Sequence, residues 1–222
     1  MDIKQFKNIL KGHPVKRIWV NIFEKHGSFF GVTSEYQSAY SSLEYAGSTS
    51  SSYVDAAFKA VIEGYERWRS GILRVDFFGS AKNLNNNWIH PKLISPLSKE
   101  QTEKCGVSYF TEDLEIPWTA GTDIKGNTVY VPSDIVYYGY ETNQNRVCFS
   151  HSSGIAAHFN LKDAQIRSLI ELIERDALMR NWFLHTSPNR IENSCLPCHA
   201  RKRIKHWKEY NRSLIILEMP SD

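Results

Sequence analysis

The sequence predicts a mixed α/β fold, and three observations support that prediction. The 222 residues are 41% hydrophobic and 23% charged, which is the balance of an ordinary folded protein. Short runs of β-branched and aromatic residues alternate with polar breakers, and two longer segments have apolar residues at helical spacing. A chain of this length can bury about 70% of its surface without disulfides or metals. No linker is evident, so residues 1–222 are predicted to form a single domain.

The expected strands are rich in β-branched and aromatic residues and end at Gly, Pro or Asn. They are residues 17–22, 72–78, 116–121, 128–131 and 212–218. Lys125-Gly126-Asn127 has the composition of a hairpin turn between the third and fourth of these strands. The hydroxyl-rich residues 48–52 and the Asn-rich residues 83–87 are predicted loops.

Two helices are expected, at about residues 55–69 and 161–183. The apolar face of the first comprises Ala56, Ala57, Ala60, Val61, Gly64 and Trp68. Asn160 is a suitable N-cap for the second helix, and Asp163 suits its first turn. The predicted apolar stripe of the second helix comprises Ile166, Leu169, Ile170, Ile173 and Ala177.

Both helices carry the same hexad, Ile-Glu-x-x-Glu-Arg, at Ile62–Arg67 and Ile170–Arg175. A single copy is typical of a solvated helix face with Glu–Arg pairs, but two copies favour a shared site. Mg²⁺ prefers carboxylate oxygens together with phosphates, and Arg binds phosphate oxygens. A di-iron site would need Glu-x-x-His instead. We therefore expect a Mg²⁺–nucleotide site in which the carboxylates converge within about 10 Å. These carboxylates belong to Glu63, Glu66, Glu171 and Glu174.

Longer stretches around the hexads resemble the YcaO-like family, whose core carries two Glu-x-x-Glu-Arg helices. The first stretch matches at Ala56, Ala60, Glu63, Glu66 and Arg67. The second begins with Ser152-Ser153-Gly154-Ile155-Ala156-Ala157 and continues through Ala164, Glu171, Glu174, Arg175, Asp176 and Ala177 to Trp182. Trp118, Val131-Pro132 and Asp134-Ile135-Val136 fit the family segment between them.

The resemblance implies a YcaO-type fold, with sheets packed against the two helices and with ATP and Mg²⁺ as cofactors. By resemblance, ATP and Mg²⁺ are held by Glu63, Glu66, Arg67, Ser153, Glu171, Glu174 and Arg175, with the Glu residues binding Mg²⁺ through the nucleotide. Family members phosphorylate a peptide amide oxygen. A Cys, Ser or Thr side chain or a sulfide source then attacks, giving an azoline or a thioamide. The family's later ATP-contacting elements would fall beyond residue 222, so the domain is expected to be incomplete at its C-terminus and inactive alone.

Departures from the family pattern support an alternative, a degenerate and catalytically inactive homologue that acts as a binding or scaffolding subunit. The family's Lys-Gly step falls on Thr49-Ser50, and a common family Ser is replaced by Lys59. The family's Asn is Ser153, and its Gly after Ala-Ala is His158. A Ser hydroxyl reaches less far than an Asn amide, and a missing Lys removes a phosphate-facing charge.

Partners and compartment follow from the charge and from the absence of targeting patterns. A net charge of +3 without a basic stripe argues against nucleic acid, and no apolar run is long enough to span a membrane. Without an export signal the protein is predicted to be cytoplasmic. A peptide or protein substrate is expected, with room for a partner protein in substrate recognition or sulfur delivery and for a homodimer.

The segment Cys195-Leu196-Pro197-Cys198-His199 leaves a third class open, an unrelated zinc or haem protein. Haem attachment would require export, so a loop with two reduced thiols is the favoured interpretation. The basic residues 201–206 that follow are interpreted as a solvated helix face, with Ile204 and Trp207 packing inward.

Overall fold

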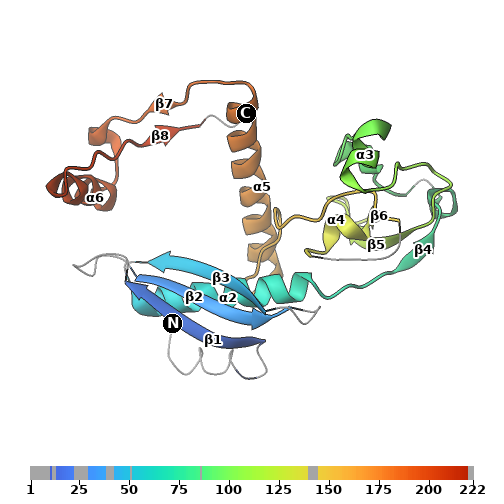
Figure 1. Cartoon of the computed structure of the whole chain (residues 1–222), viewed down its shortest axis with the longest axis horizontal. Helices are drawn as coiled ribbons and strands as arrows, with labels where there is room; N and C mark the ends of the chain where they lie inside the picture. Colours follow the sequence, from blue (N-terminus) through green and yellow to red (C-terminus); the bar gives the residue numbers. More distant parts are fainter. Residues whose placement is uncertain are drawn as a thin grey trace. The chain divides into compact units, whose positions relative to one another are not determined.

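The computed structural model describes residues 11, 14–22, 30–38, 43–50, 52–85, 87–139 and 145–219, and it has the predicted mixed α/β character (Figure 1). Ser51 and Asn86, within the two predicted loops, lie outside these residues, as do residues 1–10 and 220–222. The chain divides into two compact units, Met1–Ala157 and His158–Asp222. Their union into a single domain stays a prediction.

The first unit opens with an antiparallel sheet of three strands in the order β1 (Val15–Ile22), β2 (Phe30–Gln37) and β3 (Leu43–Ser50). Strand β1 confirms the strand predicted at residues 17–22. The loop predicted at residues 48–52 is wrong for Ser48–Ser50, which continue β3 and pair with Phe30–Val32. Ladder hydrogen bonds to the central strand override the weak β preference of Ser, since strand formation depends strongly on context.

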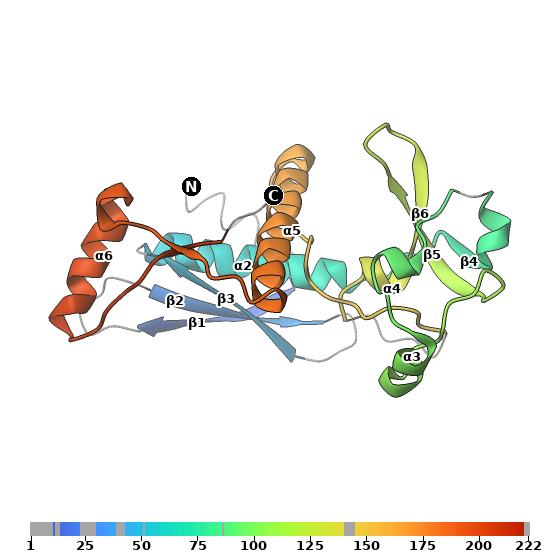
Figure 2. The same cartoon turned by 90° about the horizontal axis from the view of Figure 1, so that it is seen from above.

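Helix α2 (Tyr53–Ser70) crosses one face of this sheet and confirms the helix predicted at residues 55–69 (Figures 1 and 2). The Ser34 hydroxyl on β2 donates a hydrogen bond to the Ala60 carbonyl at 2.6 Å. A Cβ atom at Gly64 would lie 2.8 Å from the Ser34 Oγ, so a glycine is required where the helix meets the strand. The buried helix residues are the small or β-branched Ala56, Ala57, Ala60, Val61 and Gly64.

The second sheet of the first unit has the antiparallel order β4 (Phe77–Gly79), β5 (Ile116–Thr122) and β6 (Thr128–Pro132). The predicted hairpin is confirmed: Gly126 has a φ of +86°, and the Asp123 carboxylate accepts the backbone N–H groups of Lys125 and Asn127. The same part of the chain contains the short helices η1 (Ala81–Leu84), η2 (Pro91–Leu93), α3 (Lys99–Cys105) and α4 (Ser133–Val136), of which α4 packs against β5 and β6.

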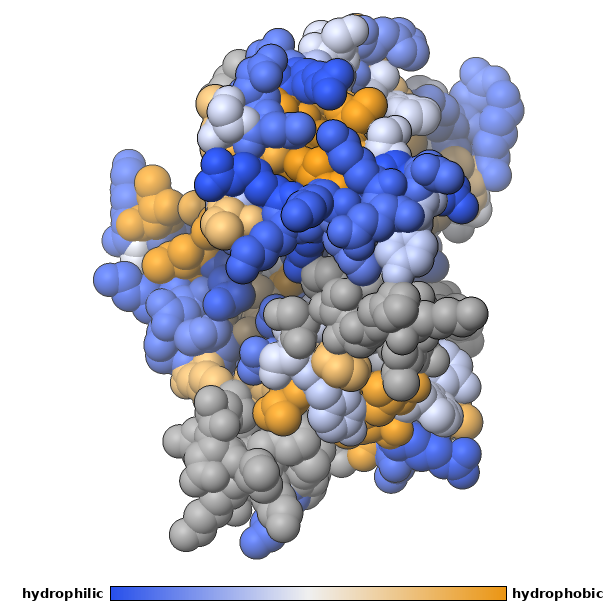
Figure 3. All heavy atoms as spheres, turned by 90° about the vertical axis from the view of Figure 1, so that its left-hand side faces the viewer, coloured by the Kyte–Doolittle hydropathy of each residue, from blue (hydrophilic) through white to orange (hydrophobic). Residues whose placement is uncertain are grey.

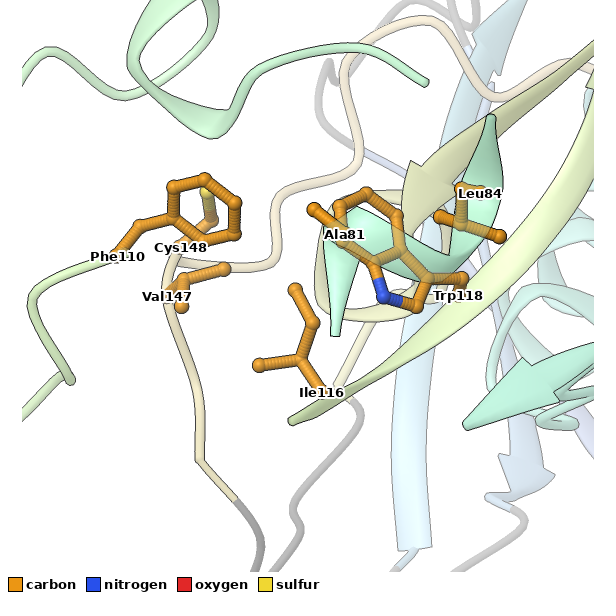
Figure 4. Close-up of a cluster of buried hydrophobic side chains, with 7 residues drawn as sticks. All are labelled: Ala81, Leu84, Phe110, Ile116, Trp118, Val147 and Cys148. Carbon is orange, nitrogen blue, oxygen red and sulfur yellow. The ribbon is translucent and has the colours of Figure 1, made fainter. Parts of the chain in front are cut away.

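Trp118 lies at the centre of the core beside the second sheet and is fully buried (Figure 4). Its indole Nε1–H donates to the Gly79 carbonyl at 3.0 Å, so the polar atom is satisfied inside the core. The other buried members of this cluster are Ala81, Leu84, Phe110, Ile116, Val147 and Cys148.

The strand predicted at residues 72–78 is wrong for all but its last two residues. Side chains replace the expected ladder hydrogen bonds: the Asp76 carboxylate accepts the Ala120 N–H, and the Thr119 hydroxyl donates to the Arg74 carbonyl, both at 3.0 Å. The Asp76 N–H donates to the Trp118 carbonyl at 3.0 Å, and the ladder begins at Phe77, which pairs with Trp118.

The second unit contains α5 (Leu161–Phe183), β7 (Asn189–Arg190), η3 (Asn193–Cys195), α6 (Cys198–Glu209) and β8 (Leu217–Glu218). Helix α5 has the bounds that the sequence predicts, and the Asn160 side chain caps it by accepting the Asp163 N–H at 2.8 Å. The strand predicted at residues 212–218 is wrong except for β8, because its antiparallel partner β7 is only two residues long.

Two packing predictions for the second unit are also corrected. Of the stripe predicted on α5, Ala177 is buried, whereas Ile166, Leu169, Ile170 and Ile173 are 46–59% exposed. Among the described residues of this unit, no helix or strand packs extensively along α5. In α6, Ile204 is buried as predicted but Trp207 is 37% exposed. On the face shown in Figure 3, hydrophilic side chains predominate among the described residues and surround small apolar areas.

Candidate functional site

The hexad on α2 holds its arginine in a fixed position. Arg67 Nη2 lies 3.6 Å from Glu63 Oε1, and the guanidinium carbon lies 5.2 Å from the centroid of the Tyr138 ring. The Arg67 side chain is 18% exposed, and its Nη1 atom is buried without a hydrogen-bond partner in the described part of the chain. A buried guanidinium donor without a partner is costly, and an anionic ligand such as a phosphate oxygen would satisfy it.

Glu66, the second carboxylate of this hexad, links α2 to the segment that contains Ser153. Its Oε2 atom accepts the backbone N–H of Ala157 at 2.9 Å. The preceding turn closes with a hydrogen bond from the Ile155 N–H to the Ser152 carbonyl, and Gly154 has a φ of +81°. This positive φ explains the Gly that follows Ser153. The structure therefore brings Glu63, Glu66, Arg67 and the Ser153 segment into one unit.

The charge of Arg67 affects a buried phenol on the sheet beneath α2. The Tyr36 hydroxyl donates to Glu44 Oε2 at 2.8 Å. Burial, followed by the hydrogen bond to Glu44, raises the pKa of Tyr36 well above its usual range, and the positive charge of Arg67 opposes that rise. Tyr36 is therefore neutral at physiological pH and packs below the hexad as an uncharged group.

The hexad on α5 has the same internal ion pair. Arg175 Nη2 lies 2.9 Å from Glu171 Oε1 and hydrogen-bonds to it. Glu171 and Glu174 face an open pocket of ≈ 620 Å³ within the second unit. The described residues that line the pocket are His158, Asp163, Ile166, Arg167, Ile170, Glu171 and Glu174, and Arg175 is not among them.

Three polar or charged lining residues were not predicted as site residues: His158, Asp163 and Arg167. His158 Nδ1 lies 3.2 Å from Asp163 Oδ2, which also accepts a hydrogen bond from the Asn160 amide at 2.6 Å. Helical periodicity could have identified two of them, since positions 163, 167, 171 and 174 fall on one face of a helix. On α5 the predicted site residues came from the hexad alone, so the other polar residues of that face were missed.

The predicted residues lie in two units, with Glu171, Glu174 and Arg175 in the second. Convergence of the two hexads stays a prediction. Across the described ranges, no group of three or more His, Cys, Asp or Glu residues is arranged to hold a metal ion by itself. Mg²⁺ is usually bound by one or two carboxylates together with phosphates and waters, so the residues present fit a Mg²⁺–nucleotide better than a bare metal.

The cysteine segment shows no metal centre among the described residues. Cys195 and Cys198 are exposed and are not disulfide-bonded. Cys148, by contrast, is buried in the Trp118 core, where desolvation and then the charge of Asp134 raise its pKa to about 12. In the part of the chain that the structure describes, no helix is both long and apolar enough to cross a membrane.

Comparison with known proteins identifies the family. The family model described as YcaO cyclodehydratase, ATP- and Mg²⁺-binding, matches residues 47–222. The chain therefore belongs to the YcaO family, whose cofactors are ATP and Mg²⁺, as the resemblance of the two hexads implied. No curated protein matches the sequence significantly.

Solved structures confirm the YcaO-type fold. A heterocyclase in complex with substrate and cofactor has a TM-score of 0.80 and 18% identity, covering 98% of this chain and 33% of that one. YcaO from Methanopyrus kandleri, bound with AMPPCP and Mg²⁺, has a TM-score of 0.68 and 16% identity over 96% and 52% of the two chains. The heterocyclase TruD has a TM-score of 0.63 and 23% identity over 76% and 27%. The chain thus spans about half or less of these proteins.

Proposed function

We propose that this chain carries the Mg²⁺–ATP-binding helices of a YcaO-type enzyme that activates peptide backbone amides by phosphorylating the amide oxygen. The observation that carries the proposal is the shared local structure of the hexads. On each helix the Arg pairs with the Glu four residues earlier, Glu63 with Arg67 at 3.6 Å and Glu171 with Arg175 at 2.9 Å. Family membership supports the nucleotide and the metal.

The acidic and the basic residues of the hexads would bind different parts of Mg²⁺–ATP. Glu63, Glu66, Glu171 and Glu174 would supply carboxylate oxygens to Mg²⁺. Arg67 would donate from its buried Nη1 to a phosphate oxygen, and the Ser153 hydroxyl would hydrogen-bond to the nucleotide. When bound, Mg²⁺–ATP supplies a phosphoryl group that converts a poor leaving group, the amide oxygen, into phosphate. The chain's own contribution is to position the charged groups before the reaction.

The product would be an azoline if a neighbouring Cys, Ser or Thr side chain attacks the activated amide, or a thioamide if sulfide attacks. A solved heterocyclase of the same fold contains both a substrate and a cofactor, which supports binding of a peptide substrate here. The proposal also includes a partner protein that recognises the substrate or delivers sulfur, and it includes a homodimer.

A non-catalytic binding subunit is the second candidate, and the position of Thr49 favours it. Thr49 lies within β3, paired with Gly31, where the family pattern has a Lys in a loop. Lys59, which replaces a family Ser, is exposed on α2. Under this alternative, phosphate release with candidate peptides would stay at background even when the chain is combined with the rest of a YcaO domain.

Nucleotide binding tests the proposal directly. Mg²⁺–ATP and Mg²⁺–AMPPCP would be titrated into the chain by calorimetry. Glu171→Gln should weaken binding by about tenfold or more, since the amide keeps the shape of the side chain but loses the charge that Mg²⁺ prefers. Glu192→Gln is the matched control, because Glu192 is exposed in the same unit and does not line the pocket. Equal affinity for the wild-type chain and Glu171→Gln would contradict the proposal.

A further inference from the structure

One guanidinium on the pocket face of α5 lies outside the hexad. Arg167 lines the pocket together with Glu171 and Glu174. It stands four residues after Asp163 and four residues before Glu171, so the three side chains follow one another along a single helix face. The pocket therefore contains a positive group between two carboxylates.

The contacts of the three arginines near the hexads differ. Arg67 pairs with Glu63 and lies over the Tyr138 ring, and Arg175 is hydrogen-bonded to Glu171. Arg167 makes no hydrogen bond or ion pair with any described residue. Its exposed guanidinium thus keeps all five N–H donors available to a ligand in the pocket.

The carboxylates on either side of Arg167 are already engaged. Asp163 accepts from the Asn160 amide at 2.6 Å and lies 3.2 Å from His158 Nδ1, and Glu171 accepts from Arg175 at 2.9 Å. These contacts weaken the attraction of both carboxylates for Arg167, so its planar guanidinium stays available to a ligand. A guanidinium fork matches the geometry of phosphate oxygens, with two parallel N–H···O bonds.

We propose that Arg167 is a phosphate-binding residue of this pocket and contacts the polyphosphate of the bound nucleotide. This inference rests on the proposed function and deepens it. It places a phosphate contact on α5 at an arginine outside the hexad. The ligand class is a nucleoside polyphosphate, because a terminal phosphate chain offers the paired oxygens that the fork requires.

A competing role for Arg167 has a different consequence. At i+4 from Asp163 and i−4 from Glu171, Arg167 could serve as an internal counter-cation that occupies the place of Mg²⁺ in the free protein. In that case its removal would strengthen Mg²⁺ binding and would not change the preference for longer phosphate chains. The two roles are therefore separable by varying the number of phosphates and the Mg²⁺ concentration.

The experiment measures dissociation constants of ATP, ADP and AMP for the full 222-residue chain, with Mg²⁺ titrated separately. Arg167→Gln should weaken Mg²⁺–ATP binding by about tenfold or more and AMP binding by less than about threefold, since hydrogen bonds to charged groups are the strong ones. Arg167→Lys should recover part of the loss, because a point charge replaces the fork. Arg180→Gln is the matched control: Arg180 pairs with Asp176 on the same helix and does not line the pocket.

Unchanged ATP affinity in Arg167→Gln, with weakened affinity in Glu171→Gln, would overturn the inference and leave the proposed function standing. Tighter Mg²⁺ binding with an unchanged ATP-to-AMP ratio would assign Arg167 to the counter-cation role and overturn the inference. An equal loss of ATP affinity in Arg180→Gln would show that the effect comes from the change in net charge, and it would also overturn the inference. A wild-type chain that binds no nucleotide would overturn the proposed function and this inference together.

Discussion

Helices α2 and α5 carry the same hexad in very different surroundings. Helix α2 buries Ala56, Ala57, Ala60, Val61 and Gly64 against its sheet, whereas Ala177 is the buried residue of α5. The two sequences agree at both Glu residues and at the Arg, and they diverge between them. The position of Gly64 on α2 is occupied on α5 by Leu172, which is 43% exposed.

This difference separates the demands of chemistry from those of packing. The charged positions of the hexad form the same i,i+4 ion pair on both helices. The positions between the Glu residues follow the local neighbours instead, because α2 brings its backbone close to a strand at Gly64. A motif can therefore be shared by two helices whose contributions to stability are unequal.

The largest expected effect is on the close contact of α2. Gly64→Val should lower the free energy of unfolding by about 2–3 kcal/mol, because the Cβ atom of the new side chain would lie 2.8 Å from the Ser34 Oγ. Leu172→Val, the same new residue at the matched position of α5, should change it by about 0.5 kcal/mol. Urea unfolding of both variants measures the difference. Equal effects would show that the two helices are packed alike.

The second expected effect concerns pH and the sheet beneath α2. Because the pKa of Tyr36 is raised in the folded protein, the unfolded chain loses its proton first as the pH rises above about 10. Stability attributable to Tyr36 should be constant below that pH and should then fall by up to about 1.4 kcal/mol per pH unit. Tyr36→Phe should remove this part of the pH dependence, measured by urea unfolding between about pH 8 and pH 11. Parallel pH curves for the two proteins would contradict the assignment.

The helix caps provide a smaller contrast. Asn160 accepts the Asp163 N–H at 2.8 Å at the start of α5, whereas Ser52 accepts the Asp55 N–H at 3.4 Å at the start of α2. Asn160→Ala should therefore cost about 1 kcal/mol, and Ser52→Ala should cost less, since the longer bond is weaker. Thermal unfolding followed by circular dichroism compares the two variants. A larger loss in Ser52→Ala would reverse the ranking.

The smallest expected effect is the stability contributed by the hexad pair on α5. Coupling between Glu171 and Arg175 should be about 0.3–0.5 kcal/mol, because the Arg175 side chain is 51% exposed and the pair is screened by water. A double-mutant cycle with Glu171→Gln and Arg175→Gln in unfolding experiments measures this coupling. A coupling above about 1.5 kcal/mol would mean that the pair serves the fold rather than the pocket.

Local patterns predicted the two long helices, α2 and α5, and the hairpin well. Helix α5 begins and ends where its cap and its periodicity indicate, and Gly126 makes the turn that Lys125-Gly126-Asn127 predicts. The prediction of a strand at residues 72–78 was wrong before Phe77, where the side chains of Asp76 and Thr119 form hydrogen bonds to the backbone. Such bonds depend on a partner far along the chain, so no local window of sequence contains them.

The sequence by itself determined the family, the two hexads and the identity of the charged groups, because these depend on residue type and on helical spacing. Tertiary structure decided which of those groups have partners among the described residues. Glu66 accepts the Ala157 N–H, whereas Arg67 Nη1 is buried without a partner among the described residues. Arg167 lines the pocket and Arg175 does not. The physical reason is that a side chain's availability depends on competing donors and acceptors, and these are brought together by folding alone.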